Sequence, residues 1–184
     1  MKYKKLGKSG IKVSEIGFGA WTIALNWWGK EIEEDEAKRM LKKAYDLGIN
    51  FFETADMYGK GKSEKLIGEV FSGMRNEVVI STKYSYDFEN VDQIGHKELP
   101  QRFDTEFTNN ALKNSLARLQ TDYIDVYGLH NPKLILRHDP FHLILSKICI
   151  RDIQALLEFQ TLEPCMFSRT VPSLIFQEAT QFFP

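Results

Sequence analysis

The sequence predicts an α/β fold built around a parallel sheet. Strand-like and helix-like segments alternate along residues 1–132, and this alternation is typical of βα units. Three of the predicted strands also end at a titratable side chain, namely Glu53, Lys83 and His130. In parallel α/β barrels the reacting groups lie at the carboxyl ends of the strands, where loops from different strands converge. The same pattern therefore predicts both a fold class and the edge of the sheet at which to look for a site.

The chain opens with a predicted hairpin and a short strand. Residues 2–6 and 11–14 flank Gly7-Lys8-Ser9-Gly10, which is typical of a turn. Residues 15–19 follow as a short strand that ends in glycine. A helix is predicted next because apolar residues recur at helical spacing, and Gly48 suits the position after its end. The apolar residues of this helix are Ala37, Met40, Leu41, Ala44 and Leu47.

The alternation continues through the middle of the chain. Apolar residues of the second and third helices fall on one face, and short apolar runs mark the strands. The predicted segments are a strand at 50–53, a helix at 63–71, a strand at 78–83, a long polar loop at 84–102, a helix at 108–119 and a strand at 122–130.

Two glycine-containing runs invite a nucleotide-binding interpretation. Gly59-Lys60-Gly61-Lys62-Ser63 resembles the end of a phosphate loop, but that motif needs a glycine where Asp56 stands. We therefore interpret the run as a loop that enters the second helix, with Ser63 as the helix cap. Gly17-Phe18-Gly19 is half of a dinucleotide fingerprint, and its glycines permit close approach of the backbone to a planar ligand.

Four titratable residues form the candidate catalytic set: Glu53, Tyr58, Lys83 and His130. Taken singly, each is more typical of a packed or solvated position. Together they complement one another, because Glu53 can pair with Lys83, and His130 can orient a carbonyl oxygen. A phenol has a pKa of about 10, and a nearby cation such as Lys83 lowers it by roughly one to three units. The set therefore predicts that Tyr58 is a proton donor.

Composition excludes several classes of function. The 184 residues carry a net charge of −1, which predicts neither a nucleic-acid nor a membrane-surface partner. There is no apolar run of the ~18 residues that a transmembrane helix requires. The two cysteines, Cys149 and Cys165, form no metal-binding spacing, so no metal site is predicted. A reduced, cytoplasmic location is the expectation.

The character of the chain changes at residue 133. All 12 glycines and all seven tyrosines precede it, although average usage of about 7% predicts three or four glycines in the segment that follows. Two interpretations of residues 133–184 stay open. One is a helical cap. The other is an end that is not the natural continuation of this fold, produced by a shifted reading frame or an alternative end.

At the candidate site residues the chain resembles the aldo-keto reductase family. The resemblance covers residues 1 to about 134. It is carried by the runs Leu6-Gly7-Lys8-Ser9-Gly10-Ile11-Lys12-Val13-Ser14, Gly17-Phe18-Gly19-Ala20-Trp21, Phe51-Phe52-Glu53-Thr54-Ala55-Asp56-Met57-Tyr58-Gly59, Ile80-Ser81-Thr82-Lys83 and Asp125-Val126-Tyr127-Gly128-Leu129-His130-Asn131-Pro132.

The resemblance implies a parallel (β/α) barrel of the TIM type, of which residues 1–132 would supply the N-terminal hairpin and about the first four βα units. It implies NADPH as cofactor and a small aldehyde or ketone as substrate. Tyr58 would be the general acid, Lys83 would depress its pKa and His130 would hydrogen-bond the carbonyl oxygen. Glu53 stands where the family usually has Asp. Gly19, Ala20 and Trp21 would line the nicotinamide side.

Two other functions stay open. Residues 135–184 resemble none of the later barrel strands, which in the family provide most of the contacts that bind the cofactor. A complete barrel of this type has about 250 residues. The chain could therefore be a truncated, catalytically silent fragment. It could also be a cofactor-sensing or association subunit. Four parallel strands would leave two open edges, through which self-association is expected.

Overall fold

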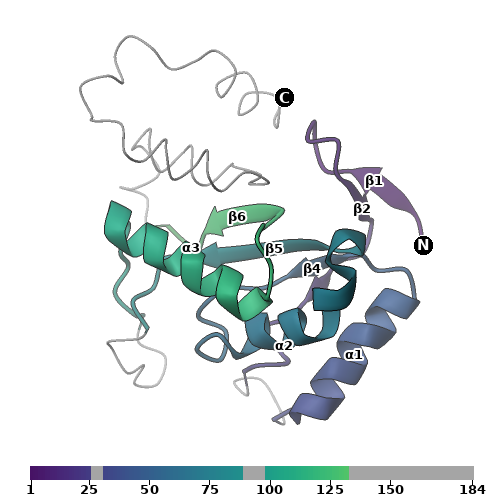
Figure 1. Ribbon diagram of the computed structural model, residues 1–184, viewed down its shortest axis with the longest axis horizontal. Coiled ribbons are helices and arrows are strands. Elements are labelled where there is room, and N and C mark those ends of the chain that lie inside the picture. Colours follow the sequence, from purple (N-terminus) through teal and green to yellow (C-terminus); the bar gives the residue numbers. More distant parts are fainter. Residues whose placement is uncertain (26–30, 89–97, 133–184) are drawn as a thin grey trace.

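The computed structural model describes residues 1–25, 31–88 and 98–132 (Figure 1). They form a two-stranded antiparallel hairpin and a four-stranded parallel sheet in the order β3-β4-β5-β6, with helices between successive strands. The strands are β1 Tyr3–Lys5, β2 Lys12–Ser14, β3 Phe18–Gly19, β4 Phe51–Glu53, β5 Val79–Tyr84 and β6 Val126–Leu129; the helices are α1 Glu34–Asp46, α2 Lys62–Phe71, the 3-10 helix η1 Ser72–Glu77 and α3 Thr105–Leu119.

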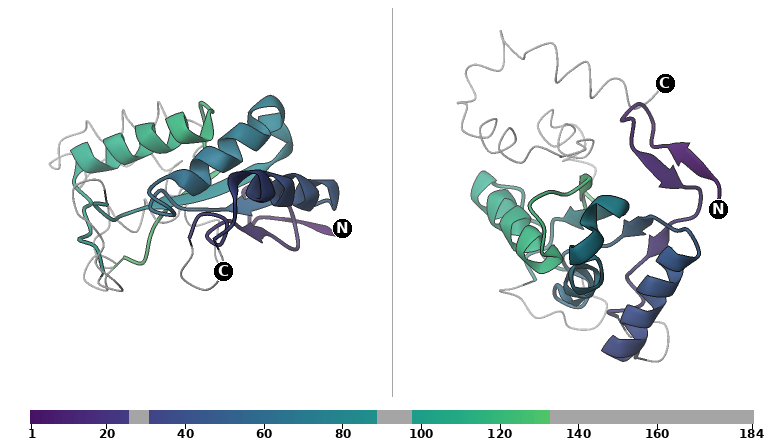
Figure 2. Two further views of the ribbon diagram at one scale, coloured as in Figure 1. Left: turned by 90° about the horizontal axis from the view of Figure 1, so that it is seen from below. Right: turned by 45° about the vertical axis from the view of Figure 1, so that its right-hand side comes forward.

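Helices α1, α2 and α3 cover the same face of the sheet (Figure 2). The main hydrophobic core lies between these two layers. In β4 the side chain of Phe52 points into that core and is fully buried, whereas the flanking Phe51 and Glu53 are only partly buried. This is the alternation of a strand, and it directs Glu53 to the face that the helices do not cover. Burying one phenylalanine side chain stabilises the fold by roughly 1.5–3 kcal/mol.

The hairpin is attached to the opposite end of the sheet from the candidate site. The Asn50 side chain, just before β4, accepts a hydrogen bond from the Ser14 N–H at 2.7 Å and donates one to the Lys12 carbonyl at 3.0 Å. Ile11 and Val13 pack with Val79 in a small second cluster. The hairpin therefore lies at the amino ends of β4 and β5.

Most predicted elements are confirmed, with shifts at their ends. Gly48 has a φ of +91° directly after the C-cap of α1, as expected of a C′ glycine. Leu47, the last of the apolar residues at helical spacing, is the C-cap of α1 and is 61% exposed. Helix α3 begins at Thr105, earlier than predicted, because the Asp104 carboxylate accepts a hydrogen bond from the Phe107 N–H at 3.0 Å and caps the helix.

The predicted role of Ser63 as a helix cap was wrong. The N-cap of α2 is Gly61, whose φ is +89°, a conformation that glycine adopts at little cost. Ser63 lies inside the first turn of the helix, where its hydroxyl is fully buried and bonded to other segments. The prediction for residues 133–184 lies outside the described residues.

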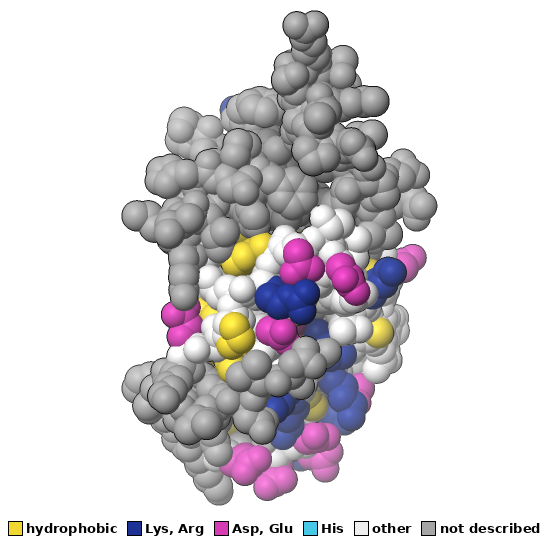
Figure 3. Space-filling view, turned by 90° about the vertical axis from the view of Figure 1, so that its left-hand side faces the viewer, with side chains coloured by type: hydrophobic (Ala, Val, Ile, Leu, Met, Phe, Trp, Pro, Cys, Tyr) yellow, Lys and Arg dark blue, Asp and Glu magenta, His cyan; other side chains and the backbone are white. Residues whose placement is uncertain are grey.

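Charges of both signs are mixed on one face of the described residues. On the face shown in Figure 3, Lys and Arg side chains of the described residues lie among Asp and Glu side chains. Within the described ranges, none of the helices is long and apolar enough to cross a membrane.

Candidate active site

The parallel register brings the carboxyl ends of three strands to the same edge of the sheet. Glu53 of β4 is level with Gly19 of β3 and with Ser81 of β5. Lys83 lies two residues beyond Ser81, so that its side chain leaves the same face of the sheet as Glu53. His130 directly follows β6, and its N–H donates to the Tyr84 carbonyl at 2.9 Å. The edge that the sequence predicted is therefore the edge at which these groups gather.

Lys83 and Glu53 form an ion pair, as the sequence predicted. The Lys83 ammonium also donates a hydrogen bond to the Thr54 carbonyl at 2.8 Å. Burial lowers the pKa of Lys83 from 10.5 to about 8, because a charge is less stable away from water. The Glu53 carboxylate acts in the opposite direction, since an anion stabilises the ammonium form.

Tyr58 lies between the lysine and the histidine. Its loop follows β4, and the Lys83 Nζ lies 5.1 Å from the centroid of the phenol ring. The imidazole of His130 lies edge-on to the same ring, with centroids 5.5 Å apart and an interplanar angle of 88°. Tyr58 thus contacts both Lys83 and His130, and Glu53 joins this group through its ion pair with Lys83.

The pKa of Tyr58 differs from the expectation. Lys83 was expected to lower it, but burial raises the Tyr58 pKa above its ordinary value of 10.0. The half-buried ring loses water that would stabilise a phenolate, and the lysine lies over the ring face. Tyr58 is therefore held as a neutral phenol, the form that can donate a proton.

His130 is neutral at physiological pH. Burial, followed by the charge of Lys83, lowers its pKa from 6.5 to about 4. Its carbonyl accepts hydrogen bonds from the Ser85 hydroxyl at 2.7 Å and from the Gln101 side-chain amide at 3.1 Å. The ring of Tyr86 also packs against the imidazole, with centroids 5.3 Å apart. Within the described ranges, the Nδ1 atom of His130 has no hydrogen-bond partner.

Sequence reasoning missed Tyr86 and Gln101. Both fall in the stretch that was predicted as a long polar loop, where they form an isolated antiparallel bridge. The only signal in the sequence was an aromatic residue three positions after Lys83.

The predicted cofactor segment lies beside Glu53. The N–H of Ala20 donates to the Glu53 carbonyl at 2.8 Å, and Ala20 is fully buried. A Cβ atom added to Gly19 would lie 4.0 Å from the Glu53 Oε2 and 3.8 Å from Trp21. Gly19 therefore leaves backbone accessible directly next to the ion pair, which fits the close approach of a planar ring.

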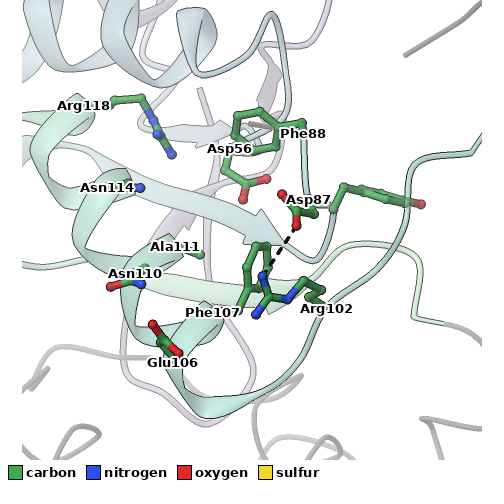
Figure 4. A pocket seen from close by; sticks show the side chains of 11 residues that line it. Asp56, Asp87, Phe88, Arg102, Glu106, Phe107, Asn110, Ala111, Asn114 and Arg118 are labelled. Carbon is green, nitrogen blue, oxygen red and sulfur yellow. Dashed lines mark ion pairs between the residues drawn. The ribbon is translucent and has the colours of Figure 1, made fainter. Parts of the chain in front are cut away.

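A cavity of about 140 Å³ lies between α3 and the segment after β5 (Figure 4). Asp56, from the Tyr58 loop, lines it, and so do Arg102 and Asp87, which form an ion pair at 3.6 Å. None of the four predicted catalytic side chains lines this cavity. It nevertheless adjoins the candidate site, because Tyr86, whose ring packs against His130, also lines the cavity.

The described residues contain no group of three or more His, Cys, Asp or Glu side chains that could hold a metal ion. A parallel sheet with a phenol, an ammonium and an imidazole gathered at its carboxyl ends is the arrangement of an α/β-barrel enzyme.

Comparison with known proteins identifies the family. The sequence model of the Aldo/keto reductase family matches residues 15–160. The chain is 35% identical over 134 residues to "Aldo-keto reductase YhdN" of Bacillus subtilis, a match that covers 72% of this chain and 38% of that protein. The chain therefore belongs to the aldo/keto reductase family, whose members are oxidoreductases.

Two further relatives bear on function and fold. A "Probable voltage-gated potassium channel subunit beta" of Arabidopsis thaliana is 38% identical over 135 residues, covering 72% of this chain and 38% of that protein. The structure of "aldo-keto reductase AKR11C1 from Bacillus halodurans (holo form)" is 33% identical with a TM-score of 0.60, covering 77% of this chain and 43% of that one. The chain thus spans about two fifths of the length of these relatives.

Proposed function

We propose that this chain carries the proton-donating half of an NADPH-dependent carbonyl reductase, which converts an aldehyde or ketone to an alcohol. The observation that supports the proposal most directly is the convergence of Tyr58, Lys83 and His130. Lys83 Nζ lies 5.1 Å from the Tyr58 ring centroid, and the Tyr58 and His130 centroids are 5.5 Å apart. A substrate oxygen at this point would meet two neutral hydrogen-bond donors next to one cation.

Each side chain then has one task. Tyr58 donates its hydroxyl proton to the carbonyl oxygen as a general acid. His130, neutral because burial holds its pKa at about 4, donates a hydrogen bond to the same oxygen. Lys83 stabilises the phenolate that Tyr58 leaves behind, and Glu53 holds Lys83 in place. Glu53 supplies the carboxylate of this catalytic set, from a side chain with one more methylene than the Asp that is usual in the family.

The cofactor supplies a hydride to the carbonyl carbon when it is bound. Gly19 and Trp21 would line its nicotinamide side, and the fully buried Ala20 would support them from inside the fold. We assign NADPH rather than NADH on the family resemblance. The reaction balances as carbonyl, NADPH and one proton giving alcohol and NADP⁺, and the proton consumed is the one that Tyr58 transfers and later regains from solvent.

A second candidate is a subunit that senses the cofactor or acts through association. The relative named as a potassium channel beta subunit favours it. Self-association through the sheet edges belongs to this candidate, since β3 and β6 are the outermost strands of the described sheet. A third candidate is a catalytically silent fragment. We place the protein in the cytoplasm in all three cases.

A turnover assay separates these functions. Purified chain is mixed with NADPH and 4-nitrobenzaldehyde, and loss of NADPH absorbance is followed together with alcohol formation. Stoichiometric turnover supports the reductase. Binding of NADPH without turnover supports the sensing subunit, and neither binding nor turnover supports the silent fragment.

A further inference from the structure

Two buried hydroxyl groups connect the segments that carry the predicted cofactor side and the predicted proton donor. The Thr54 hydroxyl donates to the Ser63 hydroxyl oxygen at 2.8 Å, and Ser63 donates in turn to the Ala20 carbonyl at 2.9 Å. All three residues are fully buried, with 0% exposure. Water therefore cannot replace either partner without opening the structure.

Backbone hydrogen bonds extend this connection to the ionisable groups. The Ser63 N–H donates to the Tyr58 carbonyl at 3.2 Å. The Thr54 carbonyl accepts from the Lys83 ammonium at 2.8 Å. Ser63 is thus bonded directly to the Tyr58 loop and to Ala20, and through Thr54 it is connected to Lys83.

The position of Ser63 in its helix leaves the hydroxyl free for this contact. Gly61, with φ of +89°, starts α2, so that Ser63 is not needed as a cap. Serine and threonine hydroxyls in helices commonly bond to their own helix backbone. Here the Ser63 hydroxyl instead bonds to a residue 43 positions away. The contact therefore fixes one segment against another.

We propose that Ser63 and Thr54 are positioning residues, which set the distance between the segment Gly19–Trp21 and the Tyr58–Lys83 pair. The inference rests on the proposed reductase function, because only a two-substrate reaction needs that distance. Hydride donor and proton donor act on adjacent atoms of one carbonyl group, and displacement of one segment by about 1 Å costs up to ~100-fold in rate.

Ser63→Ala and Thr54→Val test the proposal, and Thr54→Ser is the conservative control. Ser63→Ala removes the donor to Ala20, whereas Thr54→Val removes the donor to Ser63 and keeps the side-chain shape. We expect kcat for 4-nitrobenzaldehyde to fall about tenfold or more in both variants, with KM for the aldehyde nearly unchanged. Thr54→Ser keeps the hydroxyl and should retain most of the rate.

Two readouts do not depend on turnover. The first is the pH titration of Lys83, followed by competitive acylation and mass spectrometry. Loosening the Thr54 carbonyl should admit water and raise the Lys83 pKa from about 8 toward 10.5. The second is the emission of Trp21 in a background with Trp27→Phe and Trp28→Phe, which should shift when the Ala20 carbonyl loses its donor.

Ser115→Ala is the matched control for a purely structural effect. Ser115 is also fully buried, on α3, and bonds to Arg118 rather than to either segment. The Ser115→Ala variant should have lower thermal stability, with the Lys83 titration and the Trp21 emission unchanged.

If Ser63→Ala does not fold, the same two readouts are measured on Thr54→Val, which then decides the test. The proposal is overturned if the variants that fold lose stability alone and keep the wild-type Lys83 titration and Trp21 emission. Absence of turnover in the wild type would refute the reductase function but leave these two readouts decisive.

Discussion

The phenol ring of Tyr58 stands edge-on to the imidazole of His130, with centroids 5.5 Å apart and planes at 88°. This packing holds the two rings together through their apolar edges and faces, so that neither ring needs the other as a hydrogen-bond partner. Both groups are neutral at physiological pH, since burial raises one pKa and lowers the other. Each ring therefore keeps one proton that it can donate, the phenol on its hydroxyl and the imidazole on one ring nitrogen.

Tyr58→Phe is expected to abolish carbonyl reduction wherever the chain is active, because the proton donor is lost while the ring packing is kept. A general acid contributes typically 10²- to 10⁴-fold to a rate. The measurement is kcat for an aldehyde with NADPH. Tyr3→Phe is the control, since Tyr3 is a surface residue of the hairpin. A Tyr58→Phe rate close to that of the wild type would rule out Tyr58 as the acid.

Glu53→Asp is expected to preserve or raise activity, and Glu53→Ala to lower it. Lys83 needs an anion beside it to remain an ammonium in a partly buried position. Aspartate supplies that anion from a side chain one methylene shorter. The test compares rates and their pH profiles. An unchanged rate and profile in Glu53→Ala would show that Glu53 takes no part.

His130 should make the folded chain less stable in acid. Its pKa is about 4 in the folded protein, whereas in the unfolded chain it has the ordinary value of 6.5. Between these two pH values the unfolded chain therefore binds a proton that the folded chain does not. Stability therefore falls as the pH drops from 6.5 to 4, by at most about 3 kcal/mol.

Urea unfolding at several pH values measures this contribution of His130 to the free energy of unfolding. A His130→Gln variant keeps the other three histidines, so the difference between the two proteins isolates His130. The difference in unfolding free energy should be constant above pH 7 and change steadily below 6.5. A difference that does not vary with pH would contradict the low pKa.

Gly68→Ala should destabilise the fold by about 1–3 kcal/mol, because the added methyl group overpacks the contact between α2 and α3. An added Cβ would lie 2.5 Å from the Arg118 carbonyl oxygen and 2.7 Å from the Leu119 carbonyl carbon. Gly73 has nothing within 4 Å of an added Cβ, so Gly73→Ala should change stability by no more than ~0.5 kcal/mol. Equal effects at both sites in urea unfolding would show that the close approach has no energetic consequence.

We expect the 184-residue chain by itself to bind NADPH weakly and to self-associate. The cations after residue 132 stand in no glycine-rich or helix-start setting that would hold a phosphate; they are Lys133, Arg137, Lys147, Arg151 and Arg169. Quenching of tryptophan fluorescence by NADPH, together with light scattering, measures both properties. Saturation at low micromolar NADPH by a monodisperse monomer would contradict this expectation.

The sequence predicted those parts of the site that follow from strand periodicity. Glu53 and Lys83 could be placed together because each ends a parallel strand, and such ends meet at one edge. Contacts between loops leave no periodic pattern in the amino-acid sequence from which they could be predicted. The Tyr86 ring against His130 and the Ser63 bond to Ala20 each join residues 43 or 44 positions apart, and only the folded chain brings them together. The Tyr58 pKa was predicted in the wrong direction, because burial of the ring is not visible in the sequence.

The buried pair of Arg75 and Asp125 lies at the other end of the strands. Arg75 bonds to the Asp125 carboxylate at 2.7 Å and to the Tyr123 carbonyl at 3.1 Å, and the same carboxylate accepts from the Ile80 N–H at 3.0 Å. These bonds lock β6 to β5 in one register. A slip of one residue would turn every side chain of β6 to the opposite face, and the imidazole that follows the strand would be aimed away from Tyr58. A charge pair remote from the chemistry thereby acts together with the hydrogen bonds of Tyr84 and Ser85 to the His130 backbone in bringing the two rings together.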